Sequence, residues 1–405
     1  KIRFDHEIGQ GMAEISDAGV LRQLLLPLDR FLKDESLYEV VINRPGEVLT
    51  EGTAGWKRHE LPDLSFDKLM RLARAVASYS NQGIDETRPL LSATLPDDER
   101  IQIVIPPATT RDTVSITIRK PSSVALSTAD LEEGGLFENV VASADQTSRE
   151  DPLLASYRSG QYRVFLEGAV LARKNIIISG ATGSGKTTIS KALIQHIPDD
   201  ERLISIEDTP ELTIPQPNHV RLFYSKGGQG LAKLGAKDLL ESCLRMRPDR
   251  IIVGEVRGGE ALDMLQAMNT GHDGSLTTLH ANTPRDALSR LETMCMMAGM
   301  DLPVKVIREQ IASAIDLIIQ QSRLRDGSRK VTSITEVAGM EGDTVVMTDI
   351  FKFEQTGIGQ DGKVIGELKP TGIRPMFGPR LEAAGFKLGP EIFGANLTEM
   401  MNRRR

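Results

Sequence analysis

The chain has 405 residues, of which 40% are hydrophobic and 26% are charged, and its net charge is −7. This composition is typical of a folded globular protein, and the length predicts two or three domains. The acidic balance, with an aromatic content of only 4%, argues against a basic nucleic-acid coat and against aromatic stacking on single strands. We therefore expect no direct sequence-specific contact with nucleic acid.

Other classes are limited by what the chain lacks. Two cysteines are too few for a four-cysteine zinc site. No apolar run approaches the length of about 20 residues that a membrane-spanning helix needs. We expect a cytoplasmic protein whose membrane contact, if any, is peripheral.

The amino-terminal part alternates between helical and strand patterns. Apolar residues recur at helical spacing in 20–33 and 66–80, and strand patterns include 39–43, a hairpin around Pro96, and 113–122. We predict an α+β domain over residues 1–125. The following stretch, 126–165, is rich in Ser, Asp, Glu and Gly and is predicted to be a linker.

Short apolar strands then alternate with amphipathic helices, which predicts a mainly parallel sheet flanked by helices over residues 166–335. The expected strands lie at 175–180, 202–208, 249–256 and 275–281, and the expected helices at 186–197, 237–247, 260–270 and 284–299. Residues 336–405 are predicted to form a β-rich carboxy-terminal extension. The expected fold class is α/β, with the α+β domain joined by the linker to this larger domain.

The stretch "GATGSGKT" follows an apolar strand and opens a helix, which is the context of a phosphate-binding P-loop. Its glycines let successive backbone N–H groups turn inward around an anion, and the helix adds its amino-terminal dipole. The pattern predicts binding of ATP with Mg²⁺, Lys186 reaching the β- and γ-phosphates and the Thr187 hydroxyl serving Mg²⁺. The predicted nucleotide-binding residues here are Gly180, Thr182, Gly183, Ser184, Gly185, Lys186, Thr187 and Thr188.

Two acidic positions follow predicted strands. P-loop ATPases usually place an acid for Mg²⁺ and then a water-activating glutamate after such a strand, and in "RIIVGEV" Gly254 replaces the first acid, so Glu255 is the candidate general base. Glu207, preferred to Asp208, follows a parallel strand at the edge where ligands bind and is the candidate for holding Mg²⁺, in part through water. The alternative for Glu255 is an exposed glutamate at a strand end without a catalytic role. The alternative for Glu207 and Asp208 is a loop acid or a helix-capping acid.

Arg257 lies two residues beyond Glu255, and its planar guanidinium suits phosphate or carboxylate. A surface charge is the alternative. "TGHDGSLTTLHAN" carries His272 and His280, which are too far apart along a strand for one zinc ion unless a turn folds the segment back. Core histidines without a functional role remain the alternative.

These stretches come in the order seen in the secretion (traffic) ATPases, which this chain resembles from about residue 20 to its end. The motifs that carry the resemblance are "GATGSGKTT", "ISIEDTPEL", "LRMRPDRIIVGEVRGGEALDMLQA" and "TGHDGSLTTLHANTPRDALSRLE". "YEVVINRPGEV", "LPDDERIQIVIPP" and "SITIRKPS" resemble the type IV secretion and conjugation branch. "DIFKFEQTGIGQDGKVIGELKPTGIRP" and the region around the histidines look like the tight-adherence pilus-assembly branch.

The resemblance implies a homohexameric ring of two-domain subunits with a RecA-like P-loop domain. It implies ATP hydrolysis that powers substrate translocation or pilus assembly, at the inner face of the bacterial inner membrane, against secretion or pilus machinery in that membrane. Arg100 and Arg119 match the arginines that the amino-terminal domain supplies to the γ-phosphate. His280 falls in the histidine box, where we expect it to sense the γ-phosphate and to couple that state to the next helix. The role of base goes to Glu255 in preference to His280.

Three other functions fit a P-loop: a RecA-like nucleic-acid motor, a small-molecule kinase, and a module that binds ATP without turnover. Low aromatic content and acidic charge disfavour the first. A kinase would need an acceptor pocket and works as a small unit. The resemblance favours the traffic ATPase, of the type IV secretion branch, with the tight-adherence motor as the alternative.

Overall fold

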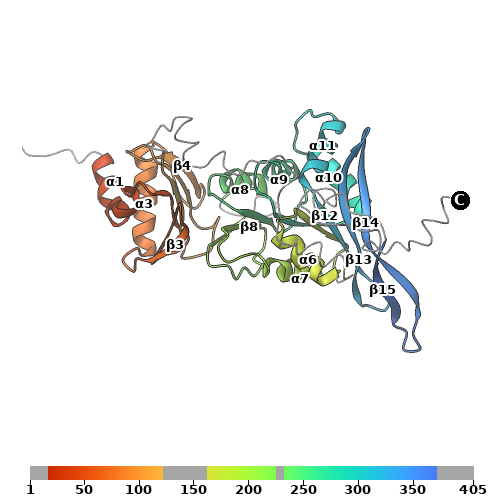
Figure 1. Ribbon diagram of the computed structural model, residues 1–405. Helices are drawn as coiled ribbons and strands as arrows, with labels where there is room; N and C mark the ends of the chain where they lie inside the picture. Colours follow the sequence, from red (N-terminus) through yellow and green to blue (C-terminus); the bar gives the residue numbers. More distant parts are fainter. Residues whose placement is uncertain (1–16, 122–161, 225–231, 372–405) are drawn as a thin grey trace, which may run out of the picture. The chain divides into compact units, whose positions relative to one another are not determined.

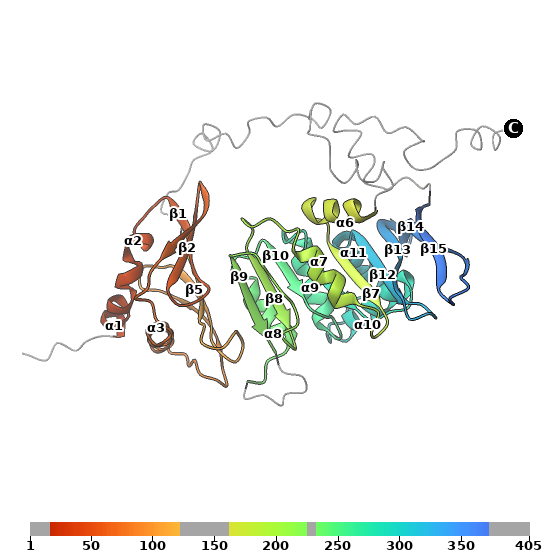
Figure 2. The same ribbon diagram turned by 90° about the horizontal axis from the view of Figure 1, so that it is seen from below.

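The computed structural model describes residues 17–121, 162–224 and 232–371. The chain divides into two compact units, residues 1–123 and 124–405. Each unit is described by itself (Figures 1 and 2). The predicted linker at 126–165 lies mainly outside the described residues, and the expected domain boundaries stay predictions.

The first unit is a six-stranded antiparallel sheet with helices packed on one face (Figure 2). The strand order is β3-β2-β1-β6-β5-β4. The strands are β1 (Leu37–Ile42), β2 (Glu47–Gly52), β3 (Gly55–Glu60), β4 (Leu90–Thr94), β5 (Arg100–Val104) and β6 (Ser115–Arg119). The helices are α1 (Asp17–Leu25), η1 (Leu26–Leu28), α2 (Asp29–Leu32) and α3 (Phe66–Tyr79).

Helix α3 shows why these residues fold as they do. The Ser65 side chain accepts a hydrogen bond from the Lys68 backbone N–H and caps the helix. Leu69, Leu72 and Val76 recur at helical spacing and are buried against the strands. The apolar stripe therefore fixes which face of α3 meets the sheet.

The second unit is a nine-stranded sheet in the order β15-β14-β13-β12-β7-β11-β10-β8-β9. Its strands are β7 (Ile176–Gly180), β8 (Leu203–Glu207), β9 (His219–Phe223), β10 (Arg250–Val253), β11 (Leu276–Leu279), β12 (Leu317–Arg323), β13 (Arg329–Glu341), β14 (Thr344–Ile358) and β15 (Val364–Pro370). Pairing is parallel from β12 to β9 and antiparallel from β12 to β15. The predicted fold class, with a mainly parallel sheet and a β-rich end, is confirmed.

Helices cover both faces of this sheet (Figure 1). One layer holds α6 (Tyr162–Leu171) and α7 (Lys186–Ile194); the other holds α8 (Ala236–Cys243), α9 (Glu260–Asn269), α10 (Pro284–Met296) and α11 (Val304–Ala314). Because both faces are covered, strands such as β7 and β8 are mainly apolar and fully buried. None of the helices in the described ranges combines the length and apolar character needed to cross a bilayer.

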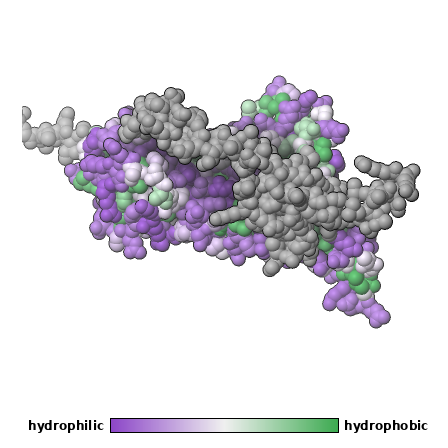
Figure 3. Space-filling view, in the orientation of Figure 1, coloured by the Kyte–Doolittle hydropathy of each residue, from purple (hydrophilic) through white to green (hydrophobic). Residues whose placement is uncertain are grey.

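Five elements were not singled out in the sequence: β3, α6, β9, α11 and β12. β12 matters most, because it lies between β7 and β13 and so joins the carboxy-terminal strands to the strand that leads into the P-loop. β13 begins at Arg329 and crosses the expected boundary at residue 335 without a break. The β14–β15 hairpin carries exposed apolar residues, among them Ile358 and Ile365, and Figure 3 shows a green patch between purple residues on this hairpin.

Candidate active site

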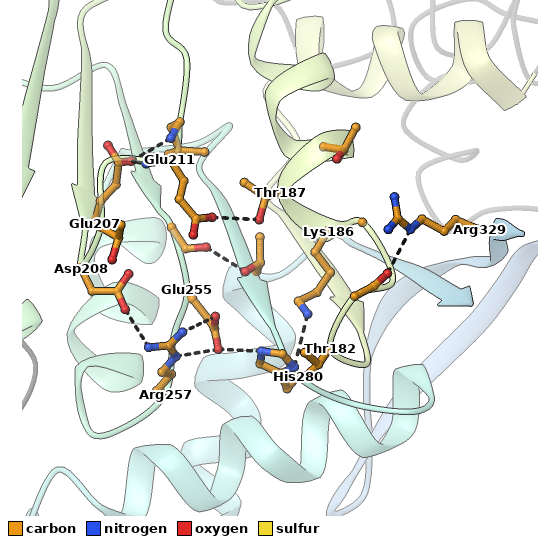
Figure 4. Close-up of a pocket in the computed structure, with 17 residues that line it drawn as sticks. Thr182, Lys186, Thr187, Glu207, Asp208, Glu211, Glu255, Arg257, His280 and Arg329 are labelled. Atoms are coloured by element: carbon orange, nitrogen blue, oxygen red, sulfur yellow. Dashed lines mark hydrogen bonds and ion pairs between the residues drawn. The ribbon is translucent and has the colours of Figure 1, made fainter. Parts of the chain in front are cut away.

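A pocket of about 390 Å³ lies at the carboxyl ends of the parallel strands, where ligands bind in open α/β sheets (Figure 4). Its volume is in the range of small-molecule sites. Ten residues selected from the sequence line it: Thr182, Gly183, Gly185, Lys186, Thr187, Thr188, Glu207, Glu255, Arg257 and His280. Segments 180–188, 207–212, 254–257 and 278–280 are thus brought together by the strand order.

The P-loop connects β7 to α7. Gly183 and Gly185 have φ values of +75° and +98°, which residues with a side chain rarely adopt. Gly180 is buried, and a Cβ there would collide with the backbone carbonyl of Gln321. Ser184 is fully buried. Gly180 and Ser184 therefore support the loop from behind the pocket lining.

Lys186 is the first residue of α7 and is buried. Its Nζ donates to the carbonyls of Gly180 at 3.0 Å and Ala181 at 3.2 Å, and lies 3.3 Å from His280 Nδ1. Burial lowers the pKa of the ammonium group. These neutral acceptors occupy all three donors of the amine, so binding of phosphate requires it to exchange partners.

Glu255, which follows β10, is clamped by Arg257. Arg257 Nε lies 2.7 Å from Oε1 of Glu255, and Arg257 Nη2 donates to Oε2 at 2.7 Å. The same guanidinium donates to Asp208 at 2.7 Å. Burial raises the pKa of Glu255, but Arg257, His280 and Lys186 outweigh burial and lower it overall. The carboxylate is therefore ionised at neutral pH and held in one orientation.

His280 joins the lysine to the glutamate. Its Nε2 lies 3.1 Å from Glu255 Oε1, while its Nδ1 faces the Lys186 amine. Burial, then the positive charges of Lys186 and Arg257, lower the pKa of the imidazole, although Glu255 raises it. A neutral ring that accepts from the ammonium at Nδ1 carries its proton on Nε2 and donates to Glu255. His272 does not line this pocket; its Nδ1 lies 3.1 Å from the carbonyl of Ala267.

Glu207 ends β8 and is buried, 2% exposed. Both its oxygens face Arg221, each at 3.0 Å. Oε1 also accepts from Ser205, and Oε2 accepts the backbone N–H of Glu211 and of Leu212. A metal at this carboxylate would compete with these five donors, and the metal role of Glu207 stays a prediction.

Two charged lining residues were missed in the sequence. Glu211 Oε2 accepts from the Thr187 hydroxyl at 3.4 Å, and its place four residues after Glu207 was the available signal. Arg329 on β13 donates from Nε to the Gly183 carbonyl at 3.0 Å. The sequence around Arg329 gives no motif, because only the antiparallel pairing of β12 with β13 brings it back to the P-loop.

Arg100 and Arg119 belong to the first unit. They are direct partners on β5 and β6 and both are exposed. Arg119 Nε lies 3.6 Å from a carboxylate oxygen of Glu39. Two neighbouring cations with little neutralisation suit an anionic ligand, and their role at a phosphate stays a prediction.

Comparison with known proteins gives a family match. Residues 27–337 match the family described as type II/IV secretion system protein. The type IV secretion system protein VirB11 of Bartonella henselae is 51% identical over 346 residues, covering 81% of this chain and 96% of that protein. PtlH, a type IV secretion system protein of Bordetella pertussis, is 42% identical over 311 residues, covering 76% and 91%. A solved structure, the VirB11 ATPase of the Brucella suis type IV secretion system in complex with sulphate, is similar with a TM-score of 0.73 at 40% identity, covering 79% and 95%.

Proposed function

The chain belongs to the type II/IV secretion system protein family, and from this premise we propose that it is a traffic ATPase that hydrolyses ATP to drive a type IV secretion system. The observation that carries this conclusion is the 51% identity to a VirB11 protein across 96% of that protein's length. It favours the secretion reading over the tight-adherence pilus motor, whose likeness was confined to the region around the histidines and the carboxy-terminal strands.

The P-loop accounts for binding of the phosphates. Its positive-φ glycines and the first turn of α7 offer backbone N–H groups to an anion. Lys186 then transfers its donors from the two loop carbonyls and His280 to the β- and γ-phosphates. When the Lys186 ammonium no longer donates to Nδ1 of His280, that nitrogen can accept a hydrogen bond from another group. The hydrogen bonding of His280 therefore changes when phosphate binds.

Glu255 accounts for activation of water. An ionised carboxylate in a partly buried pocket can accept the proton of a water that attacks the γ-phosphorus, while the bond to the β–γ bridging oxygen breaks and ADP leaves. Arg257 contacts both oxygens of Glu255, and His280 contacts Oε1. One of these contacts has to open for water to reach the carboxylate, and His280 is the partner that nucleotide binding releases.

The oxygen atoms of the pocket suit a magnesium ion as ligands. The Thr187 hydroxyl faces the Glu211 carboxylate, and Mg²⁺ prefers oxygen ligands together with waters and substrate phosphates. We expect Thr187 to hold the metal and the carboxylates of Glu211 and Glu207 to orient its waters. When bound, the ion supplies positive charge to the phosphates.

Partners and location follow from the family by analogy. We propose a homohexamer at the cytoplasmic face of the bacterial inner membrane, in contact with secretion components there. Arg100 and Arg119 are proposed to bring positive charge to the γ-phosphate. Their exposed, paired placement on neighbouring strands supports this role.

The function is tested by ATP hydrolysis with the purified full-length chain and Mg²⁺. Wild type should release phosphate, and Lys186→Ala should lose turnover by at least about 10²-fold because the phosphates lose their P-loop cation. Lys191→Ala, a change on the same helix outside the pocket lining, is the matched control. Turnover by Lys186→Ala at the wild-type rate would overturn the assignment, and binding without turnover by wild type would favour a nucleotide-gated module.

A further inference from the structure

Arg329 reaches the P-loop from a strand that none of the nucleotide motifs includes. Its Nε donates to the Gly183 carbonyl at 3.0 Å, and it lines the same pocket as Lys186 (Figure 4). The side chain also passes Gly185, where a Cβ would lie 3.3 Å from Arg329 Cδ. The contact therefore involves both positive-φ glycines of the loop.

The bond fixes one particular peptide unit. The Gly183 carbonyl and the Ser184 N–H belong to the same planar group and point in opposite directions. Arg329 holds the carbonyl end, and the carbonyl of Ala181 accepts the N–H end at 3.2 Å. A loop whose peptide is held at both ends loses less conformational freedom when an anion binds.

The turn that carries Arg329 is itself tied to the carboxy-terminal hairpin. Asp326 Oδ1 accepts the N–H and the hydroxyl of Ser328, at 2.9 and 2.6 Å. Its Oδ2 accepts the backbone N–H of Val364, the first residue of β15, at 2.8 Å. These bonds, led by the Ser328 hydroxyl, lower the pKa of Asp326 to about 2. Val364 lies beyond residues 27–337, the part of the chain that matches the family.

We propose that Arg329 is a positioning residue that pre-orders the P-loop through Gly183, and that the β14–β15 hairpin sets Arg329 through Asp326. The proposal rests on the nucleotide site described above. It assigns the hairpin, which lies outside the family match, a role in nucleotide affinity. Arg329 acts before chemistry, because the hydrogen bond from its Nε goes to the loop and not to a catalytic side chain.

The test compares Kd, KM and kcat for ATP, and Kd for ADP, in wild type and Arg329→Ala. A charged hydrogen bond of this kind, exposed to solvent, is expected to change affinity by about five- to tenfold. KM and both Kd values should rise together by that factor with kcat unchanged, because a pre-ordered loop favours ground and transition states alike. Arg325→Ala, which removes an exposed cation from the same turn, is the control for long-range charge and should behave as wild type.

The hairpin link is tested by Val364→Pro, which removes the N–H and leaves Asp326 with Ser328, and by Asp326→Asn. Proline is tolerated at the first residue of a strand. Each should raise Kd by about twofold, and neither should add to Arg329→Ala in the double variant, because the three groups act in series.

Several results overturn the proposal. Unchanged or tighter nucleotide binding by Arg329→Ala does so, and so does a fall in its kcat. A rise in Kd for ATP but not for ADP also does so, because it would mean that Arg329 contacts the γ-phosphate. If the increases in Kd of the single variants multiply in the double variants, the hairpin does not act through Arg329, and that part of the proposal is wrong. Absence of ATP binding by wild type would instead contradict the proposed function. Thermal melting without nucleotide should match wild type for Arg329→Ala, so that a folding defect is separated from a loop effect.

Discussion

The Nε2 atom of His280 lies 3.1 Å from Oε1 of Glu255, while the Nδ1 atom of the same ring lies 3.3 Å from the Lys186 amine. One imidazole thus contacts the phosphate-binding cation and the candidate base. A neutral ring donates through one nitrogen and accepts through the other. When Lys186 changes its partner, the hydrogen bond from His280 to Glu255 therefore changes as well.

Glu255→Gln should keep ATP binding and lower kcat by about 10²- to 10⁴-fold, the usual contribution of a general base. The amide is nearly isosteric but cannot take the proton of water at neutral pH. Nucleotide binding by fluorescence titration and turnover by phosphate release separate the two effects. Glu241→Gln, on the exposed side of α8, is the control. Hydrolysis by Glu255→Gln at the wild-type rate would show that another group is the base.

His280→Ala should bind ATP and lower kcat by about tenfold or more, because Glu255 and Lys186 lose their common partner. His280→Gln should recover part of this loss, since one amide offers an acceptor to Lys186 and a donor to Glu255. Steady-state kinetics on both variants test the relay. Equal loss in the alanine and glutamine variants would mean that the ring itself, and not its two hydrogen bonds, is required.

The pH dependence of kcat/KM follows from the same contact. The lowered pKa of His280 keeps the free enzyme's imidazole neutral above its ordinary value of about 6.5. Protonation would remove the acceptor for Lys186 and place two cations together, so activity should be retained above pH of about 6.5 and fall only below it. In His280→Gln the acid limb should move lower, toward protonation of Glu255. An acid limb in wild type above pH of about 6.5 would show that His280 is charged in the free enzyme.

Arg119→Ala and Arg100→Ala should lower kcat without unfolding the first unit. Both side chains are exposed, and the ion pair of Arg119 with Glu39 is worth about 1 kcal/mol or less. A cation that neutralises the departing phosphate is worth about 10³-fold or more in kcat. Arg111→Ala, an exposed arginine of the same unit, is the control. Wild-type kcat in both variants would remove these arginines from the site.

Much of the fold follows from local patterns. Apolar strands such as β7, β8 and β10 and the amphipathic helix α3 were expected within a few residues of their observed bounds. α11 and β12 were not, although Asp326-Gly327 is a turn signal between β12 and β13. The P-loop was found from its motif, and Glu255 from its place after a strand. The role of His280 came from the resemblance to the histidine box.

Other features depend on contacts between distant segments. Glu207 was selected as a metal residue from its strand-end position, but its carboxylate is engaged by Arg221, which lies across the β8–β9 pair. Arg257 was expected to pair with phosphate or carboxylate, and its guanidinium donates to Glu255 and Asp208. Neither partnership has a sequence signal, because hydrogen-bond partners are chosen among whatever the sheet brings within reach.

The sequence by itself determined the two-part fold class, the phosphate-binding loop and the family resemblance, because these rest on residue types at fixed short spacing. Only the tertiary structure decided which side chains meet: His280 with Lys186 and Glu255, and Arg329 with Gly183. The physical reason is that a hydrogen bond depends on position to within a few tenths of an ångström. That position is set by strand order and register, which bring residues 146 positions apart into one contact.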